Sequence, residues 1–398
     1  MHLSFSTEFL TDTRKYFNTS LGLNGSSSYL VPEYLISALA YASLFAMMAM
    51  GLTLTYMTTK VPNFAFGDFV TLGIYSSYTT VRVFHSNPYV GSALGFAVGA
   101  LVSAVMYLAV LRPLARRGSS LVSLMIATFG VDIGFIGLFG IYTDYLQYNL
   151  KFIDAPNFYT LGPDFTLWGY AGVDFAAPLS VVIIVLSIYL LFTRTRFGVA
   201  MRAAVENPPL ARVLGINVDM VTTVSWMLAG GFAGYAGALL TLQLPAGTAT
   251  GSNFIVEIFS SSVLGGLTSI FGAAVGGLII GGSEILVTLD LGLGFGTIGT
   301  IVIVALLILG GVLLIRRKRL RTKVVGVLFA GFGVWIIADM AAGFPVDFMS
   351  YELVNGFGPN VTPFQQAIPL LIMVITLMVI PQGIFSINFR RLLRREKK

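Results

Sequence analysis

The chain has 398 residues, of which 56% are hydrophobic and only 11% charged, and its formal net charge is +6. Its mean hydropathy is +0.84. So few charges cannot cover the surface of a soluble protein, and the apolar residues come in runs of about 20, the length that crosses a hydrocarbon core about 30 Å thick. The composition therefore excludes a soluble enzyme or a nucleic-acid-binding domain and indicates a polytopic integral membrane protein.

In chain order, the hydrophobic runs predict an all-α, polytopic transmembrane helix bundle with about nine full spans. Residues 1–33 are a polar segment, expected to be external, in which no cleavable signal peptide is visible. The predicted spans are 34–57, 61–81, 89–111, 119–142, 176–193, 219–242, 297–315, 324–342 and 367–385. We expect one membrane permease domain over 34–386, followed by a basic cytoplasmic tail at 387–398.

One further apolar stretch, residues 254–289, is broken by the sequence Gly-Gly-Leu-Thr-Ser at 265–269. It predicts a re-entrant pair of short helices that enter and leave on the same side. Two pairs of glycines in this stretch are spaced to permit close helix contact: Gly272 with Gly276, and Gly277 with Gly281. Glu284 in the same stretch and Asp132 in the fourth span are charges in apolar runs, where a charge usually faces the bundle or a cavity.

The basic residues predict the orientation of the chain. A single alternation of spans puts 20 of the 24 Lys and Arg residues on one side: Lys60, Arg112–Arg117, Arg194–Arg212, Arg316–Lys323 and Arg390–Lys398. Because Lys and Arg accumulate in cytoplasmic loops, we expect a multi-pass protein of the cell membrane with its N-terminus outside and its C-terminus inside. An acidic loop, 144–174, and three Asn-x-Ser/Thr triplets, at Asn18, Asn24 and Asn360, fall on the predicted exterior.

Several kinds of chemistry are excluded by what the sequence lacks. The chain has no cysteine and only two histidines, His2 and His85, and no lysine follows a glycine. These absences exclude thiol catalysis, a Cys- or His-rich metal site and a P-loop for ATP. We therefore expect neither an enzyme nor a chain that binds a metal or cofactor of its own.

The loop between the fifth and sixth predicted spans contains a capped helix. Asn207 is a favourable N-cap, Pro208 suits the first helical position, and Gly215 is a left-handed stop. The pattern predicts a short helix over Leu210–Leu214 that lies across the loop. The residues alone leave two interpretations open: a face offered to a partner, or an amphipathic segment that covers the base of the bundle.

Irregular backbone is predicted where the second span begins. The sequence Val61–Val70 contains Asn63, Gly67 and Asp68, which are poor residues for the start of a lipid-facing helix. A broken helix at membrane depth must be buried in protein or line a cavity, and its free backbone groups can hold a polar solute. The alternative is a tight interfacial turn that leaves Asp68 among lipid headgroups or in water.

Six segments, in this order and spacing, carry a resemblance to known proteins: Gly51–Tyr56, Asn63–Phe69, Arg112–Leu114, Arg194–Ile216, Leu264–Glu284 and Pro381–Phe385. Together they resemble the branched-chain amino-acid (LivH-like) permease family of ABC importers, over about 34–290 and 366–386. The chain departs from the family at Phe66, where a His is usual, so its solute specificity can differ. It departs again at 297–365, an apparent insertion of two spans.

The resemblance implies a division of labour among several proteins. An extracellular solute-binding protein would deliver the solute, this chain and a second homologous permease subunit would form the pathway, and two ABC ATPase subunits would bind the ATP. Membrane lipid is the remaining expected partner, and nucleic acid is not one. The residues expected to couple to the ATPase are Arg196, Gly198, Arg202, Glu206, Asn207, Leu210, Ala211, Leu214 and Gly215. The candidate pathway residues are Asn63, Phe66, Gly67, Asp68, Gly265, Gly266, Thr268 and Glu284.

The function implied by the resemblance is that of the transmembrane permease subunit of an ATP-driven importer for branched-chain or related amino acids. The alternatives are a permease for urea or short amides, a secondary transporter or channel for a small solute, and a membrane enzyme or non-transporting assembly subunit. If the loop helix couples to an ATPase, replacing Arg202, Glu206 or Leu210 by Ala is expected to abolish uptake and to leave the protein in the membrane.

Overall fold

The computed structural model describes residues 33–158, 160, 164–293, 327, 331, 334–335 and 367–379. Contacts within the chain divide it into two compact units, Met1–Gly282 with Ile380–Lys398, and Ser283–Val379. The helices are α2 (Glu33–Thr59), α3 (Phe66–Tyr78), α4 (Pro88–Met106), α5 (Arg112–Arg116), α6 (Leu121–Tyr148), α7 (Val173–Arg194), α8 (Arg196–Glu206), α9 (Pro208–Val213), α10 (Val218–Leu240), α11 (Thr250–Asn253), α12 (Ile255–Gly265), α13 (Ile270–Leu293) and α18 (Ala367–Val379). Two π-helical segments, η1 (Thr79–Val83) and η2 (Tyr107–Leu111), extend α3 and α4.

The predicted all-α helix bundle is confirmed, with six helices in the described residues long and apolar enough to cross a membrane: Leu35–Thr59, Pro88–Arg116, Leu121–Tyr148, Val173–Arg194, Val218–Leu240 and Ile270–Val287. The second predicted span is shorter than expected, because α3 begins only at Phe66. The predicted spans 297–315 and 324–342 lie outside the continuously described residues. The span predicted at 367–385 is described as far as Val379, as α18.

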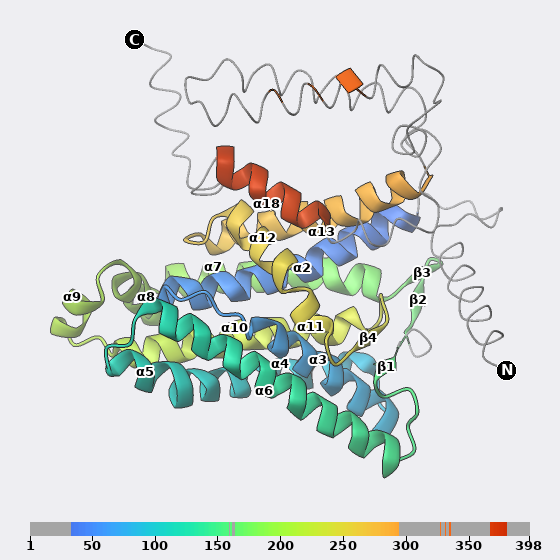
Figure 1. The fold of residues 1–398 in the computed structure, drawn as a ribbon, viewed down its shortest axis with the longest axis horizontal. Helices are drawn as coiled ribbons and strands as arrows, with labels where there is room; N and C mark the ends of the chain where they lie inside the picture. The colour runs from blue at the N-terminus through green and yellow to red at the C-terminus, as the bar shows by residue number, and fades with distance from the viewer. Residues whose placement is uncertain are drawn as a thin grey trace. The chain divides into compact units, whose positions relative to one another are not determined.

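The core of the first unit is a crossing of α4 with α10, which lie side by side in Figure 1. A Cβ atom added at Gly234 would lie 2.1 Å from the carbonyl oxygen of Gly95, and one added at Gly99 would lie 2.2 Å from that of Gly230. Gly73 of α3 approaches Gly234 in the same way, at 1.9 Å. The three helices thus meet backbone to backbone, as small residues permit in membrane proteins. Around them, α2 and α10 are largely buried, whereas α6 and α7 expose most of their apolar surface.

The broken stretch forms a helix pair beside α2. The Phe254 ring, at the start of α12, lies 5.5 Å from that of Phe45, and the Ser262 hydroxyl donates to the carbonyl of Ala49 at 3.0 Å. From Phe254 to Ser262 along α12, the contacted residue of α2 moves from Phe45 to Ala49, so α12 runs parallel to α2. Gly266, with φ of +106°, then turns the chain, a conformation that favours glycine.

Both predicted glycine pairs of α13 make close contacts, one with α12 and one with α2: Gly272 and Gly276 face α12, and Gly277 and Gly281 face α2. Gly277 lies against Ala46 and Gly281, one turn later, against Ala42, so α13 runs antiparallel to α2. The two helices therefore form an antiparallel pair joined at the predicted break, residues 265–269. However, α13 is longer than a short re-entrant helix, because its apolar sequence continues to Leu293.

Two groups of short elements lie at opposite ends of the bundle in Figure 1: α5, α8 and α9 at one end, and the strands at the other. Strand β1 (Asn157–Phe158) pairs antiparallel with β4 (Ala246–Gly247), and β2 (Thr166–Leu167) pairs with β3 (Tyr170–Ala171).

The acidic loop at the strand end is held to the bundle by its carboxylates. Asp154 accepts hydrogen bonds from Arg82 at 2.6 Å and from the Tyr78 hydroxyl at 2.9 Å. Asp164 accepts from the Tyr89 hydroxyl at 2.8 Å. These acidic residues, which the sequence connected only with orientation, therefore also anchor the loop.

Candidate functional site

The capped helix predicted in the loop between α7 and α10 is present as α9. The Asn207 side chain accepts a hydrogen bond from the amide of Leu210 at 3.1 Å, and Pro208 occupies the first position. Gly215 adopts φ of +81° and ends the helix. The predicted cap at Asn207 and stop at Gly215 are confirmed. The helix covers Pro208–Val213 and not Leu210–Leu214, because both prolines fit its first turn.

A second helix, α8, precedes α9 and was not predicted. The Thr195 hydroxyl accepts from the amide of Gly198 at 3.2 Å and caps the start of α8. A Cβ added at Gly198 would lie 2.4 Å from the Cα of Phe192, so only glycine lets α8 fold back onto the end of α7. The Arg202 guanidinium donates to the carbonyl of Phe192. Gly198 and Arg202, both expected to couple to an ATPase, thus also fix α8 to α7.

The loop helix has a buried anchor and an exposed apolar face. Ala211 is only 1% exposed, whereas Leu210, Val213 and Leu214 are 53%, 83% and 69% exposed. Most of the predicted coupling residues are exposed in the same way: Arg196, Arg202, Glu206, Asn207, Leu210, Leu214 and Gly215. Only Gly198 and Ala211 are buried. The exposed set is therefore available to a partner, and the buried pair holds it in place.

An ion cluster centred on Asp219 lies beside α9. The Asp219 carboxylate accepts hydrogen bonds from Arg112 at 3.1 and 2.8 Å and from Arg116 at 2.5 Å. Arg212 of α9 lies 4.0 Å from its other oxygen. This cluster connects α5, α9 and α10. The sequence connected these arginines with orientation only, and no local signal paired them with Asp219.

The predicted irregular backbone before α3 is present and buried. Residues 60–65 are not helical, and Asn63 is 0% exposed, with neither side-chain amide atom hydrogen-bonded in the described part of the chain. The amide of Phe64 donates to the Thr128 hydroxyl of α6 at 3.2 Å. The sequence predicted that the break includes Gly67 and Asp68. This is wrong, because both residues lie in the first turn of α3 and the irregular segment ends before them.

The interfacial-turn alternative is wrong for Asp68, which is buried in protein. Its side chain is 0% exposed, and neither carboxylate oxygen has a hydrogen-bond partner among the described residues. The titratable group beside it is the carboxyl of Asp132 in α6. Asp132 in turn accepts a hydrogen bond from the Ser252 hydroxyl of α11 at 3.0 Å.

A glycine contact places α11 against α3 at this point. A Cβ added at Gly67 would lie 2.2 Å from the carbonyl oxygen of Gly251, and the Gly251 amide donates to the Thr71 hydroxyl at 3.2 Å. Because the two backbones touch, the next residue of α11, Ser252, reaches Asp132. Asn63, Asp68, Asp132 and Ser252 are called the buried polar cluster below.

The remaining pathway candidates lie elsewhere. The Phe66 ring packs between Gly51 of α2 and Phe69, whose ring centroid is 5.9 Å away, and is fully buried. Gly265 and Gly266 end α12, and Thr268 is exposed in the turn before α13. Glu284 is buried on the part of α13 that belongs to the second unit.

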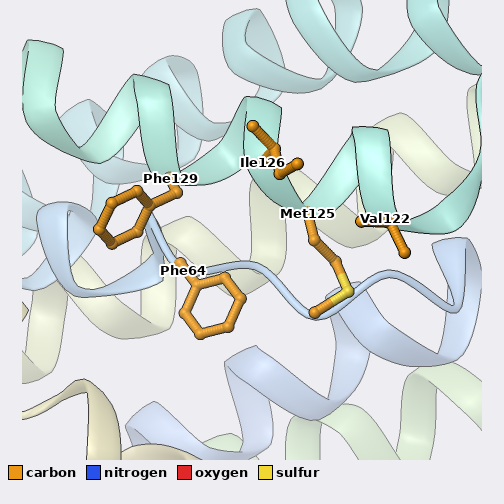
Figure 2. Close-up of a pocket in the computed structure, with 5 residues that line it drawn as sticks. All are labelled: Phe64, Val122, Met125, Ile126 and Phe129. Carbon is orange, nitrogen blue, oxygen red and sulfur yellow. The ribbon is translucent and has the colours of Figure 1, made fainter.

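An apolar groove of about 280 Å³ lies beside the irregular segment. Figure 2 shows it between the irregular segment, which carries Phe64, and one face of α6. Its lining residues are Phe64, Val122, Met125, Ile126 and Phe129. The groove therefore adjoins the place where Phe64 and Thr128 connect the irregular segment to α6.

Comparison with known proteins agrees with the motifs. The family described as "Branched-chain amino acid transport system / permease component" matches residues 34–309. The probable branched-chain amino acid transport permease protein LivH of Methanocaldococcus jannaschii is 42% identical over 260 residues, which are 65% of this chain and 82% of that protein. The chain belongs to this permease family. It is a multi-pass membrane protein, and the resemblance predicted from the motifs is confirmed.

More distant relatives of this permease differ in the solutes that their names give. The branched-chain amino acid permease BraD of Pseudomonas aeruginosa is 26% identical over 63% of this chain and 84% of its own. The ribose import permease RbsC of Escherichia coli is also 26% identical, over 64% of this chain and 78% of its own. No solved structure matches the chain. The family match extends to residue 309, so it includes the first part of the stretch 297–365 that the sequence suggested as an insertion.

Proposed function

We propose that this permease is the transmembrane subunit of an ATP-driven ABC importer for branched-chain or related amino acids. The single observation that carries the coupling role is the exposed apolar face of α9, held by the buried anchor Ala211 and by the Asp219 ion cluster. A large exposed apolar surface with a rigid support is typical of a protein–protein contact. We infer that this face docks on an ABC ATPase subunit that binds the ATP.

The orientation follows from this assignment. The end of the bundle that carries α5, α8 and α9 faces the cytoplasm, and the strand end faces outward, where a solute-binding protein delivers the solute. A second homologous permease subunit completes the pathway. This arrangement is supported by the basic residues Arg112, Arg116 and Arg212, which gather at the α9 end.

We prefer an amino acid as the solute because of the sequence identities between this chain and its relatives. The LivH relative is 42% identical, whereas the ribose permease is 26% identical, as is the amino-acid permease BraD. The closer relation to LivH therefore favours a branched-chain or related amino acid over a sugar, urea or a short amide.

The contacts described above provide a route for force. Movement of α9 passes to α7 through α8, which Gly198 and Arg202 fix to the end of α7, and to α10 through Asp219. Helix α10 meets α4 and α3 at the glycine crossing, so its displacement reaches the first turn of α3 and the buried polar cluster. ATP binding and hydrolysis on the partner would thus alternate two packings of the bundle.

Replacing Leu210 by Ala tests the docking face. Truncating a half-exposed leucine that becomes buried on docking removes about 1–2 kcal/mol of contact, so we expect leucine uptake to fall about ten-fold and less ATPase to copurify. The matched control is Leu186→Ala, which shortens a leucine of α7 that is 56% exposed and distant from α9 in sequence. Unchanged uptake and copurification in Leu210→Ala would contradict the docking role.

Energy coupling is tested in the same cells. If ATP drives transport, leucine uptake by the wild-type protein continues when the proton gradient is collapsed and ATP is maintained. Uptake that stops under these conditions would favour a secondary transporter over an ABC importer.

A further inference from the structure

Among the aspartates that are buried or ion-paired in the described residues, Asp68 has no N–H or hydroxyl donor. Four others each accept a hydrogen bond from another side chain: Asp154, Asp164, Asp174 and Asp219. Asp68 is fully buried, no N–H or hydroxyl group of the described residues donates to it, and the group beside it is the carboxyl of Asp132. Two carboxyl groups side by side inside a protein cannot both carry a charge at low cost, so a proton or a positive group must lie between them. Burying the two carboxyl groups together therefore lowers the stability of the fold.

The start of α3 and the Asn63 side-chain amide lie close to these carboxyl groups. Ala65 gives α3 no side-chain cap, so the positive end of this helix is left without a capping acceptor. Asn63, two residues earlier, is 0% exposed and has an amide nitrogen with no acceptor. Within about one turn, the chain thus presents a pair of carboxyl groups and the unpaired amide nitrogen of Asn63.

We propose that Asp68 and Asp132 bind a compact monovalent cationic group, the ammonium group of a transported α-amino acid, with its carboxylate toward Asn63 and the first turn of α3. This proposal rests on the proposed function and deepens it, because it assigns the recognition of the zwitterion to the permease itself. A primary ammonium group suits the site because it has one positive charge and three N–H donors for carboxylate oxygens. A free alkali cation carries the same single positive charge, and the experiment below distinguishes it from an ammonium group.

The oxygens of Asp68 are covered by protein here, so loading requires a neighbour to move. Helix α11 is the suitable element, because it has a single turn and contacts α3 through Gly251 and Thr71. When α11 withdraws, Ser252 leaves Asp132, and both carboxylates become accessible to a solute.

The first test measures the thermal unfolding midpoint (Tm) of the purified full chain in detergent, together with leucine uptake in cells. Removing one of two repelling buried carboxylates should raise Tm, so we expect Asp68→Asn to be about 2–4 °C more stable and yet to lose at least ten-fold in uptake. A carboxylate with a purely structural role would give the opposite shift. The control Asp154→Asn breaks a partly exposed ion pair and should leave Tm equal to or slightly below that of the wild type. A lower Tm in Asp68→Asn, or unchanged uptake, would overturn the proposal.

The second test adds ligands to the same purified protein, without ATP or partner subunits. Leucine and 3-methylbutylamine, which carry the ammonium group, should raise the Tm of the wild type and not that of Asp68→Asn, whereas 4-methylpentanoate, which lacks it, should have no effect. A shift with sodium or potassium over choline, and none with the amines, would overturn the substrate assignment in favour of a free-cation site. No shift with any probe would overturn the site. Because these readings need no ATPase, they are independent of the docking experiment on Leu210.

Discussion

Glycine serves two different purposes at single positions of this chain. Gly215 and Gly266 have positive φ angles and allow sharp changes of direction after α9 and α12. Gly95 and Gly234 instead remove a side chain where two helix backbones touch. By contrast, Gly134 of α6 has no atom within 4 Å of an added Cβ. The cost of a substitution at a glycine therefore depends on which of these surroundings it has.

Gly234→Ala tests the helix crossing. The new methyl group would lie 2.1 Å from a backbone oxygen, which cannot rotate away, so we expect a loss of about 3 kcal/mol or more in stability. The measurement is Tm in detergent and the amount of protein in the membrane. In Gly134→Ala, the added methyl group meets open space, and a stability at or slightly above that of the wild type is expected. Equal stability of the two variants would show that the crossing is not closely packed.

At the scale of elements, the Asp219 cluster makes three short segments act together. Its carboxylate is the common acceptor for α5 and α9, and it belongs to α10. The partners are a quarter to two-thirds exposed, so solvent weakens each pair, and the cluster contributes about 1 kcal/mol in total. Its importance lies in the direction in which it holds α9, and less in the stability of the fold.

Asp219→Asn separates these two contributions. We expect Tm to change little, and the ATP hydrolysed per leucine transported by the assembled complex to rise between about three- and ten-fold, because α9 no longer transmits its movement fully to α10. Purified complex in liposomes gives both rates. The control Asp154→Asn breaks an ion pair at the opposite end of the bundle and should leave this ratio unchanged. A normal ratio in Asp219→Asn would contradict a positioning role.

The sequence predicted those features whose causes are local. The cap, start and stop of α9 lie within nine residues, and the break between α12 and α13 is specified by Gly265 and Gly266. The ion cluster was not predictable, since Arg112 and Arg116 lie 107 and 103 residues from Asp219. The surroundings of Asp68 depend likewise on α6 and α11. A residue type indicates that a polar group needs a partner, and only the folded chain shows whether one is supplied.

For the whole molecule, the main open prediction is its orientation in the membrane. Two ends are distinguished by the elements described above, α9 at one and the strands at the other. Since positive charge accumulates in cytoplasmic loops, the α9 end is expected inside the cell. Val213 and Ile153, each 83% exposed, mark the two ends.

Labelling of single cysteines tests this orientation directly, because the natural chain has no cysteine. A membrane-impermeant maleimide should label Ile153→Cys in intact cells. It should label Val213→Cys only after the membrane is permeabilised. The unsubstituted chain is the control and should remain unlabelled. Labelling of Val213→Cys in intact cells would place α9 outside and contradict docking on a cytoplasmic ATPase.

The pairing of β1 with β4 has a consequence for how these permeases diverge. The ladder joins Asn157 and Phe158 to Gly247 and Ala246 through main-chain atoms. Almost any residue other than proline supplies the same N–H and C=O groups, so the join survives most substitutions. An exposed residue such as Asn157 can therefore change between species while the two loops stay joined, whereas Gly247 cannot, because a Cβ there would lie 2.3 Å from the carbonyl oxygen of Pro156. Comparison of side chains alone would overlook this fastening in distant homologues.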